Sequence, residues 1–205
     1  MAPSEIDAIR ALLGSKPRPV GWFERRQRLD EVGSTWPVAP DVKCEAVDCD
    51  SVPGEWSRAP DSDASSVLLY FHGGGYCSGS IVSHRRLVTE AGRAARARTL
   101  AIDYRRAPEH PYAYAPPPAD RCDPLISPLF ADFAGFPPTL IQVGSAETLL
   151  ADATRLAETA GTADVGVTLE IWPHMIHAWP VWNAGLEDGR RALASAGQFI
   201  RTHLQ

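Results

Sequence analysis

The apolar positions of the chain change their period along its length, and each period predicts one kind of element. A continuous apolar run occupies residues 67–71, mostly apolar runs occupy 99–102 and 139–143, and the stretch "VGVTLEIW" follows later. Such runs suit strands that are covered on both faces of a parallel sheet. Apolar residues at helical spacing lie between and after them, at 83–96, 149–160 and 186–204. Strands that alternate with helices predict an α/β fold built from βαβ units.

The first sixty residues follow a different pattern. Ser4 and Asp7 resemble a capping box, and the apolar spacing after them predicts a helix of about ten residues. The stretch "WFERRQRLDEVG" predicts a second helix, and the short alternating stretches between 42 and 59 predict two edge strands. We therefore expect N-terminal helices over 1–36 and an α/β core over 37–205.

Charge and hydropathy restrict the partners and the location of the protein. The 205 residues carry a formal net charge of −5, and no basic run is longer than two residues. Nucleic acid is therefore not an expected partner, because phosphate binding leaves a basic footprint. The N-terminus lacks the pattern of a signal peptide, and no stretch approaches the ~18 consecutive apolar residues of a membrane span. We expect a cytoplasmic protein without a membrane span.

The cysteines predict neither a disulfide framework nor a metal site. Cys44, Cys49, Cys77 and Cys122 are scattered and form no C-x-x-C pair. Without a secretory signal they are expected to be reduced thiols. No metal and no cofactor are expected.

Residues 71–80 read "FHGGGYCSGS" and directly follow the first apolar run. Three glycines allow the backbone to approach a ligand closely and to present N–H groups to an anion. Taken alone, this loop also fits a phosphate-binding loop or a simple tight turn.

Four motifs in order extend this observation to most of the chain. They are "HGGGYCSGS", "DYRRAPEHP", "DPLISPLFADFAGFPPTLIQVGSAETLLADA" and "WPHMIHAW". Together they resemble the bacterial hormone-sensitive-lipase-like carboxylesterases, which have the α/β-hydrolase fold. The resemblance implies hydrolysis of small-molecule, short-chain esters, and a mostly parallel sheet with N-terminal helices as a cap.

The resemblance also implies roles for individual residues. Gly73 and Gly74 would donate N–H groups to the oxyanion of the tetrahedral intermediate, and His72 would orient their loop. His177 would be the general base, and Glu147 the carboxylate that orients it.

Two of these assignments have alternatives in the sequence. His174 lies three residues before His177, and Asp152 is a second candidate for the orienting acid. Glu147 itself also fits a glutamate that is placed before a helix because the helix dipole favours negative charge there.

The nucleophile of this family is missing from the expected place. The family carries it in a G-x-S-x-G elbow between the second and third motifs, where this chain has only the eight residues 113–120. At about 30 residues per βαβ unit, the elbow strand, its helix and a further strand amount to a loss of roughly 60 to 110 residues. The fold is thus expected to be truncated in its middle strands.

Other nucleophiles are poorly placed. Cys77 lies in a G-x-C-x-G stretch, and thiolates attack readily, but it belongs to the oxyanion loop itself. The segment 195–197 falls within the pattern of the last helix. Four further serines lack any elbow context: Ser78, Ser80, Ser127 and Ser145. Ser80 is expected to cap the following helix.

Loss of the central strands has consequences for packing and activity. For the sheet to close, the strand at 67–71 would have to pair with the strand at 139–143. Apolar surface left uncovered would favour a homodimer or aggregation. The sequence indicates a carboxylesterase-family hydrolase with weak or absent activity. The alternatives are a non-catalytic small-molecule-binding protein on the same scaffold and a nonfunctional deletion remnant.

Overall fold

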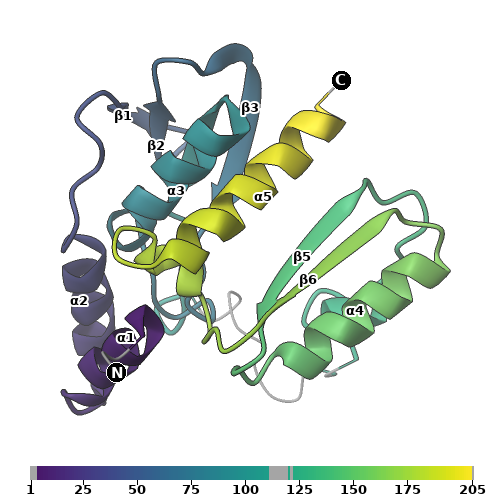
Figure 1. Ribbon diagram of the computed structural model, residues 1–205, viewed down its shortest axis with the longest axis horizontal. Helices are drawn as coiled ribbons and strands as arrows, with labels where there is room; N and C mark the ends of the chain where they lie inside the picture. The colour runs from purple at the N-terminus through teal and green to yellow at the C-terminus, as the bar shows by residue number, and fades with distance from the viewer. Residues whose placement is uncertain (1–3, 111–119, 121, 205) are drawn as a thin grey trace. The chain divides into compact units, whose positions relative to one another are not determined.

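The computed structural model describes residues 4–110, 120 and 122–204 (Figure 1). The chain divides into two compact units, one formed by 1–114 and 180–205 and the other by 115–179. Most of the segment 113–120, where the elbow is missing, lies outside the described residues.

The first unit contains a four-stranded sheet in the order β1-β2-β4-β3. Its strands are β1 (Lys43–Asp48), β2 (Pro53–Arg58), β3 (Asp63–Phe71) and β4 (Ala97–Ile102). β2 pairs antiparallel with β1 and with β4, whereas β3 and β4 are parallel. The expectation of two edge strands was therefore wrong for β2. Its short alternating pattern and its turn residues are typical of an edge strand, but β2 lies between two neighbours.

β3 was also expected to be covered on both faces, and this was wrong. Its apolar side chains alternate in burial, and Val67, Leu69 and Phe71 are 41%, 49% and 60% exposed. Among the described strands β3 pairs only with β4, so it forms an edge of the sheet. The sheet contacts of α3 are mainly with β2 and β4, so β3 lacks the helix cover on both faces that a central strand of a parallel sheet has.

Four α-helices lie in the described part of the first unit, and two of them begin at capping serines. They are α1 (Glu5–Gly14), α2 (Trp22–Gly33), α3 (Ile81–Ala95) and α5 (Glu187–His203). Ser4 caps α1, and Ser80 caps α3 through a capping box with Ser83. α3 packs on β2 and β4 and lies side by side with α5 (Figure 1). A Cβ on Gly197 would stand 2.4 Å from the backbone of Ala94, so glycine permits this close contact.

The second unit contains one parallel strand–helix–strand arrangement. β5 (Thr139–Gly144) and β6 (Val167–Trp172) pair in parallel, and α4 (Leu150–Thr162) connects and covers them. A short 3-10 helix, η2 (Pro128–Phe130), also contacts α4. The core is formed by Phe133, Ala160 and Val165.

The expected closure of one continuous sheet does not occur. β3 belongs to the four-stranded sheet, whereas β5 pairs with β6 in a two-stranded sheet of its own. α3 packs on the four-stranded sheet, and α4 packs on the two-stranded sheet. The α/β class is confirmed.

Two further features concern the described part of the chain. No helix in it combines the length and the apolar character that are needed to cross a bilayer. Its four cysteines are free thiols.

Candidate active site

The glycine-rich loop connects β3 to α3 and is folded around one carbonyl group. The N–H groups of Cys77 and Ser78 donate to the Gly74 carbonyl at 3.3 and 3.0 Å, and the Ser78 hydroxyl donates to it at 2.9 Å. Gly74 has a φ of 126°, which side chains disfavour. A Cβ at Gly74 would stand 2.1 Å from the Ser78 carbonyl oxygen. Glycine is therefore required at this position.

The loop leaves two backbone donors available. The N–H groups of Gly73 and Gly74 donate no hydrogen bond to any residue within the described ranges. Fixed backbone donors of this kind can bind an anion or a developing oxyanion. These are the two N–H groups that the sequence resemblance assigned to an oxyanion hole.

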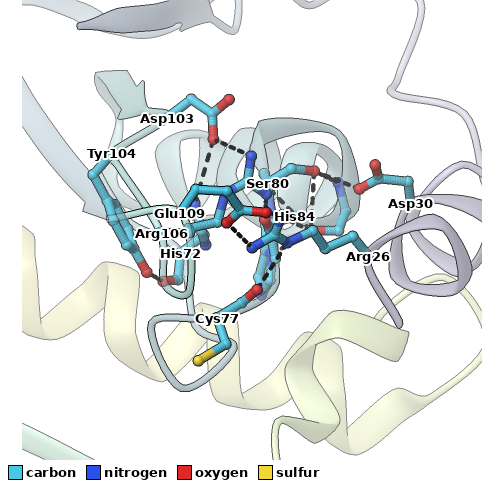
Figure 2. Close-up of polar contacts among 12 residues, drawn as sticks. Arg26, Asp30, His72, Cys77, Ser80, His84, Asp103, Tyr104, Arg106 and Glu109 are labelled. Carbon is cyan, nitrogen blue, oxygen red and sulfur yellow. Dashed lines mark hydrogen bonds and ion pairs between the residues drawn. The ribbon is translucent and has the colours of Figure 1, made fainter. Parts of the chain in front are cut away.

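His72 is buried next to this loop and is held from several sides (Figure 2). Its Nδ1 lies 2.9 Å from the Gly73 carbonyl oxygen, and the Tyr104 hydroxyl donates to the His72 carbonyl at 2.5 Å. The Tyr104 ring stacks on the imidazole with 4.3 Å between the ring centroids. The Nε2 of His72 lies 3.7 Å from a carboxylate oxygen of Asp103. The segment "DYRRAPEHP" thus braces the loop.

Arg26 attaches α2 to the same loop. Its Nε donates to the Cys77 carbonyl at 2.8 Å, and a terminal nitrogen donates to the Ala107 carbonyl at 2.7 Å. The guanidinium also binds both carboxylate oxygens of Glu109 at 2.8 Å. This hydrogen bonding lowers the pKa of Glu109 to about 2. Sequence reasoning missed Arg26, because its partners lie more than 50 residues away and no local pattern indicates them.

A groove of about 710 Å³ borders α2 and the end of the loop. Its polar lining includes Arg26, Asp30, Ser80, Asp103 and Arg106. The volume lies within the range of small-molecule pockets. Gly73 and Gly74 are not part of its lining.

The alternative nucleophiles in this unit occupy structural positions. Cys77 is 7% exposed, and Figure 2 shows its sulfur pointing away from the polar cluster, on the side opposite its carbonyl. Ser80 is committed to capping: its hydroxyl accepts from the Ser83 N–H at 3.0 Å and donates to Asp30 at 2.5 Å. The predicted capping role of Ser80 is confirmed.

His84 lies next to His72 and is held in its neutral form. The ring centroids of the two histidines are 5.9 Å apart, and the Nδ1 of His84 lies 2.9 Å from the Ser83 hydroxyl. Burial, together with the proximity of His72, lowers the pKa of His84 from 6.5 to about 4.

We expect acid to destabilise the fold through His84. The unfolded chain binds a proton at this imidazole below pH 6.5, whereas the folded chain binds it only near pH 4. Stability is therefore lost as the pH falls from 6.5 towards 4, by about 3 kcal/mol at most. Urea unfolding at pH 7 and pH 5 should show a smaller loss for His84→Gln than for the parent chain. Equal losses in both proteins would contradict this assignment.

The second unit brings Glu147 and His177 together. The Nδ1 of His177 lies 2.5 Å from one carboxylate oxygen of Glu147. The other oxygen accepts the Gly144 N–H at 2.7 Å. The Glu147 side chain is 5% exposed, whereas the His177 side chain is 70% exposed. A buried, hydrogen-bonded carboxylate thus holds one nitrogen of an exposed imidazole.

The loops after β5 and β6 brace each other and place this pair. The Ser145 N–H donates to the Trp172 carbonyl at 2.9 Å, and the Ala146 N–H donates to the Met175 carbonyl at 3.0 Å. Gly144 lies directly against Met175, whose carbonyl oxygen would stand 2.2 Å from a Cβ at that position. This contact explains why a glycine ends β5.

The structure separates Glu147 and His177 from their alternatives. The His174 backbone N–H donates to the Ser145 hydroxyl at 2.8 Å, and His174 adopts a φ of 62°. Asp152 lies in the first turn of α4 and has no recorded contact with His177. The carboxylate of Glu147 does not cap α4, since its two oxygens bind Gly144 and His177.

No metal centre is formed in the part of the chain that the structure describes. There, no group of three or more His, Cys, Asp or Glu side chains is placed to hold an ion.

Known proteins resemble the chain over most of its length. A sequence model of the alpha/beta hydrolase fold matches residues 68–116 and 113–181. An acetyl-hydrolase of Streptomyces hygroscopicus is 28% identical and is aligned over 98% of each chain. A solved esterase/lipase from an uncultured bacterium has a TM-score of 0.91 at 28% identity, covering 98% of this chain and 99% of its own. An esterase of the bacterial hormone-sensitive lipase family has a TM-score of 0.89 at 27% identity, with full coverage of both chains.

The alignment with the acetyl-hydrolase is longer than this chain. The alignment with the acetyl-hydrolase runs over 300 positions, whereas this chain has 205 residues. At least 95 aligned positions therefore have no residue in this chain. The match to the alpha/beta hydrolase fold is also interrupted, and its two parts meet at residues 113–116.

Proposed function

The chain belongs to the alpha/beta hydrolase fold family, among the hormone-sensitive-lipase-like carboxylesterases, and on this premise we propose that it carries the oxyanion loop and the base of a short-chain ester hydrolase without the serine nucleophile. The observation that carries the proposal is the 2.5 Å contact between His177 and the buried carboxylate of Glu147. Turnover through a serine acyl-enzyme is accordingly absent, and any remaining activity is weak.

In this proposal Gly73 and Gly74 are the oxyanion donors. Their N–H groups lack partners within the described residues, and the φ of Gly74 fixes the loop. Each such donor contributes roughly 3 to 4 kcal/mol to transition-state stabilisation in serine hydrolases. His72 positions the loop through its contact with the Gly73 carbonyl.

His177 is the general base and Glu147 its orienting acid. The carboxylate accepts a hydrogen bond from the Nδ1–H, so the lone pair of Nε2 remains available to accept a proton. In the related esterases, we infer, this nitrogen faces the serine of the elbow. Here no G-x-S-x-G sequence occurs anywhere in the chain.

Three observations support an internal loss near residues 113–120. The alignment with the acetyl-hydrolase contains at least 95 positions without a residue in this chain. The family match is interrupted at 113–116. Among the described strands, β3 and β5 each pair with a single neighbour, as strands next to a missing centre would. The N-terminal helices correspond to the cap, with Arg26 as the attachment of α2.

We expect the purified chain to be folded but inactive towards alkyl esters. Circular dichroism verifies the fold, a pH-stat assay with ethyl butyrate measures turnover, and intact mass after a fluorophosphonate label detects a reactive serine. The expected result is no turnover and no adduct. Turnover with a stoichiometric serine adduct would overturn the proposal, because a nucleophile would then be present. Saturable ester binding without turnover would favour the binding-protein alternative.

A further inference from the structure

The imidazole of His177 is largely exposed and is held by one partner, whereas a general base in a closed active site is shielded from solvent. Its side chain is 70% exposed, and its recorded hydrogen bond within the described residues is to Glu147 alone. Its Nε2 is thus open to a reactant from solution. This differs from His72, whose side chain is 2% exposed.

We propose that His177 is itself a nucleophile, and that the chain hydrolyses activated aryl esters through an acyl-histidine intermediate. This inference rests on the proposed function, because it uses the same pair of residues after loss of the serine. It names a substrate class, aryl esters with acidic phenol leaving groups, and a covalent intermediate on Nε2.

Glu147 prepares the imidazole for attack. A neutral imidazole carries one proton, and a carboxylate at 2.5 Å from Nδ1 accepts the hydrogen bond from that proton. The second carboxylate oxygen is fixed by the Gly144 N–H at 2.7 Å, so the acceptor cannot turn away. The lone pair therefore resides on Nε2, the nitrogen that is exposed. Positive charge that develops on the ring during attack is stabilised by the same carboxylate.

The reaction proceeds in two balanced steps. In the first, Nε2 bonds to the ester carbonyl carbon, the bond from that carbon to the phenolic oxygen breaks, and the phenolate leaves with the electron pair. The product is an acyl-imidazolium whose Nδ1 proton remains in the hydrogen bond to Glu147. In the second step, water adds to the acyl carbon, the carbon–nitrogen bond breaks with its electron pair left on Nε2, and the carboxylic acid and the free neutral imidazole are released together with one proton, which passes to the solvent.

The chemistry of the leaving group decides which esters react. The tetrahedral intermediate contains both the imidazole and the alcohol oxygen, and the better leaving group is expelled. A nitrophenolate leaves more readily than imidazole, whereas an alkoxide leaves far less readily. A serine triad avoids this limit because its histidine protonates the leaving alcohol, but here that histidine is the attacking group. The chain should therefore hydrolyse aryl esters and not their alkyl counterparts.

The test compares p-nitrophenyl acetate with ethyl acetate on the whole chain. We expect release of nitrophenolate, no hydrolysis of ethyl acetate, and a single short-lived acetyl adduct that rapid intact mass spectrometry detects in the parent chain and not in His177→Ala. His177→Ala should lower the aryl ester rate at least about tenfold, and Glu147→Gln should lower it severalfold without a change in circular dichroism.

His203 provides the matched control. It is also exposed, but its Nδ1 contacts the Phe199 carbonyl at 2.8 Å in place of a carboxylate. His203→Ala should keep the full rate. An aryl ester rate that His177→Ala leaves unchanged, or an acetyl adduct that His177→Ala retains, would overturn the inference. Such a result would leave the proposed function intact as long as ethyl butyrate and fluorophosphonate remain unreactive, so the two failures are distinguishable.

Discussion

Insertion of a central segment with a serine elbow is expected to raise hydrolysis of p-nitrophenyl butyrate by at least about 10³-fold in kcat/KM. The insert is a segment of at least 95 residues that contains the G-x-S-x-G elbow of a related esterase, and it replaces residues 113–120. Loss of a triad serine alone costs a comparable or larger factor in serine hydrolases, because the base and the acid act as a unit with it. Activity towards ethyl butyrate should appear with it, since a serine triad protonates the leaving alcohol.

The restored chain also tests each assignment. Alanine in place of the inserted serine, and His177→Ala, should each remove the gain, and fluorophosphonate should label only the chain that contains the serine. His174→Ala should retain most of the gain. A folded, labelled and active chain that does not depend on His177 would contradict the assignment of the base. Circular dichroism and thermal unfolding separate an inactive site from an insert that has not folded.

Local sequence patterns predicted the elements of this fold because the signals lie within a few residues of each other. The second helix runs over the predicted residues, Trp22–Gly33, and Ser80 caps α3 as expected. Apolar runs located β4, β5 and β6 to within two residues. Burial could not be predicted in the same way, since it depends on which strands are neighbours. The apolar run of β3 reads as a central strand but lies at an edge.

The candidate site was predictable only through motifs. Glu147 and His177 lie 30 residues apart, and neither the charge pattern nor the periodicity connects them. The family resemblance supplied that connection, and the structure shows the contact. The contacts of Arg26 had no such motif, because a guanidinium that binds two carbonyl groups and a carboxylate leaves no periodic signal in the sequence. Long-range polar contacts of this kind come from the fold alone.

Gly79→Ala is expected to lower the free energy of unfolding by about 3 kcal/mol or more. Gly79 has a φ of 85°, where an alanine is strained. Its Cβ would stand 2.1 Å from the Gly73 carbonyl oxygen and 2.6 Å from the Nδ1 of His72. The same substitution therefore also displaces the 2.9 Å contact that holds His72 on its loop. Denaturant unfolding followed by circular dichroism measures the change.

Gly73→Ala is the control that shows whether the loop is destabilised by any added side chain or only by one at Gly79. A Cβ at Gly73 would have its nearest neighbour, the Nε2 of His84, at 3.9 Å, and no positive φ opposes it. Its stability should change by no more than about 0.5 kcal/mol. If the two variants unfold at the same denaturant concentration, the close contact of Gly79 with Gly73 and His72 does not stabilise the loop. The only role of the glycines would then be to let a ligand approach the backbone. A large loss confined to Gly79→Ala means that the loop needs this glycine for its own fold, whether or not a nucleophile is present.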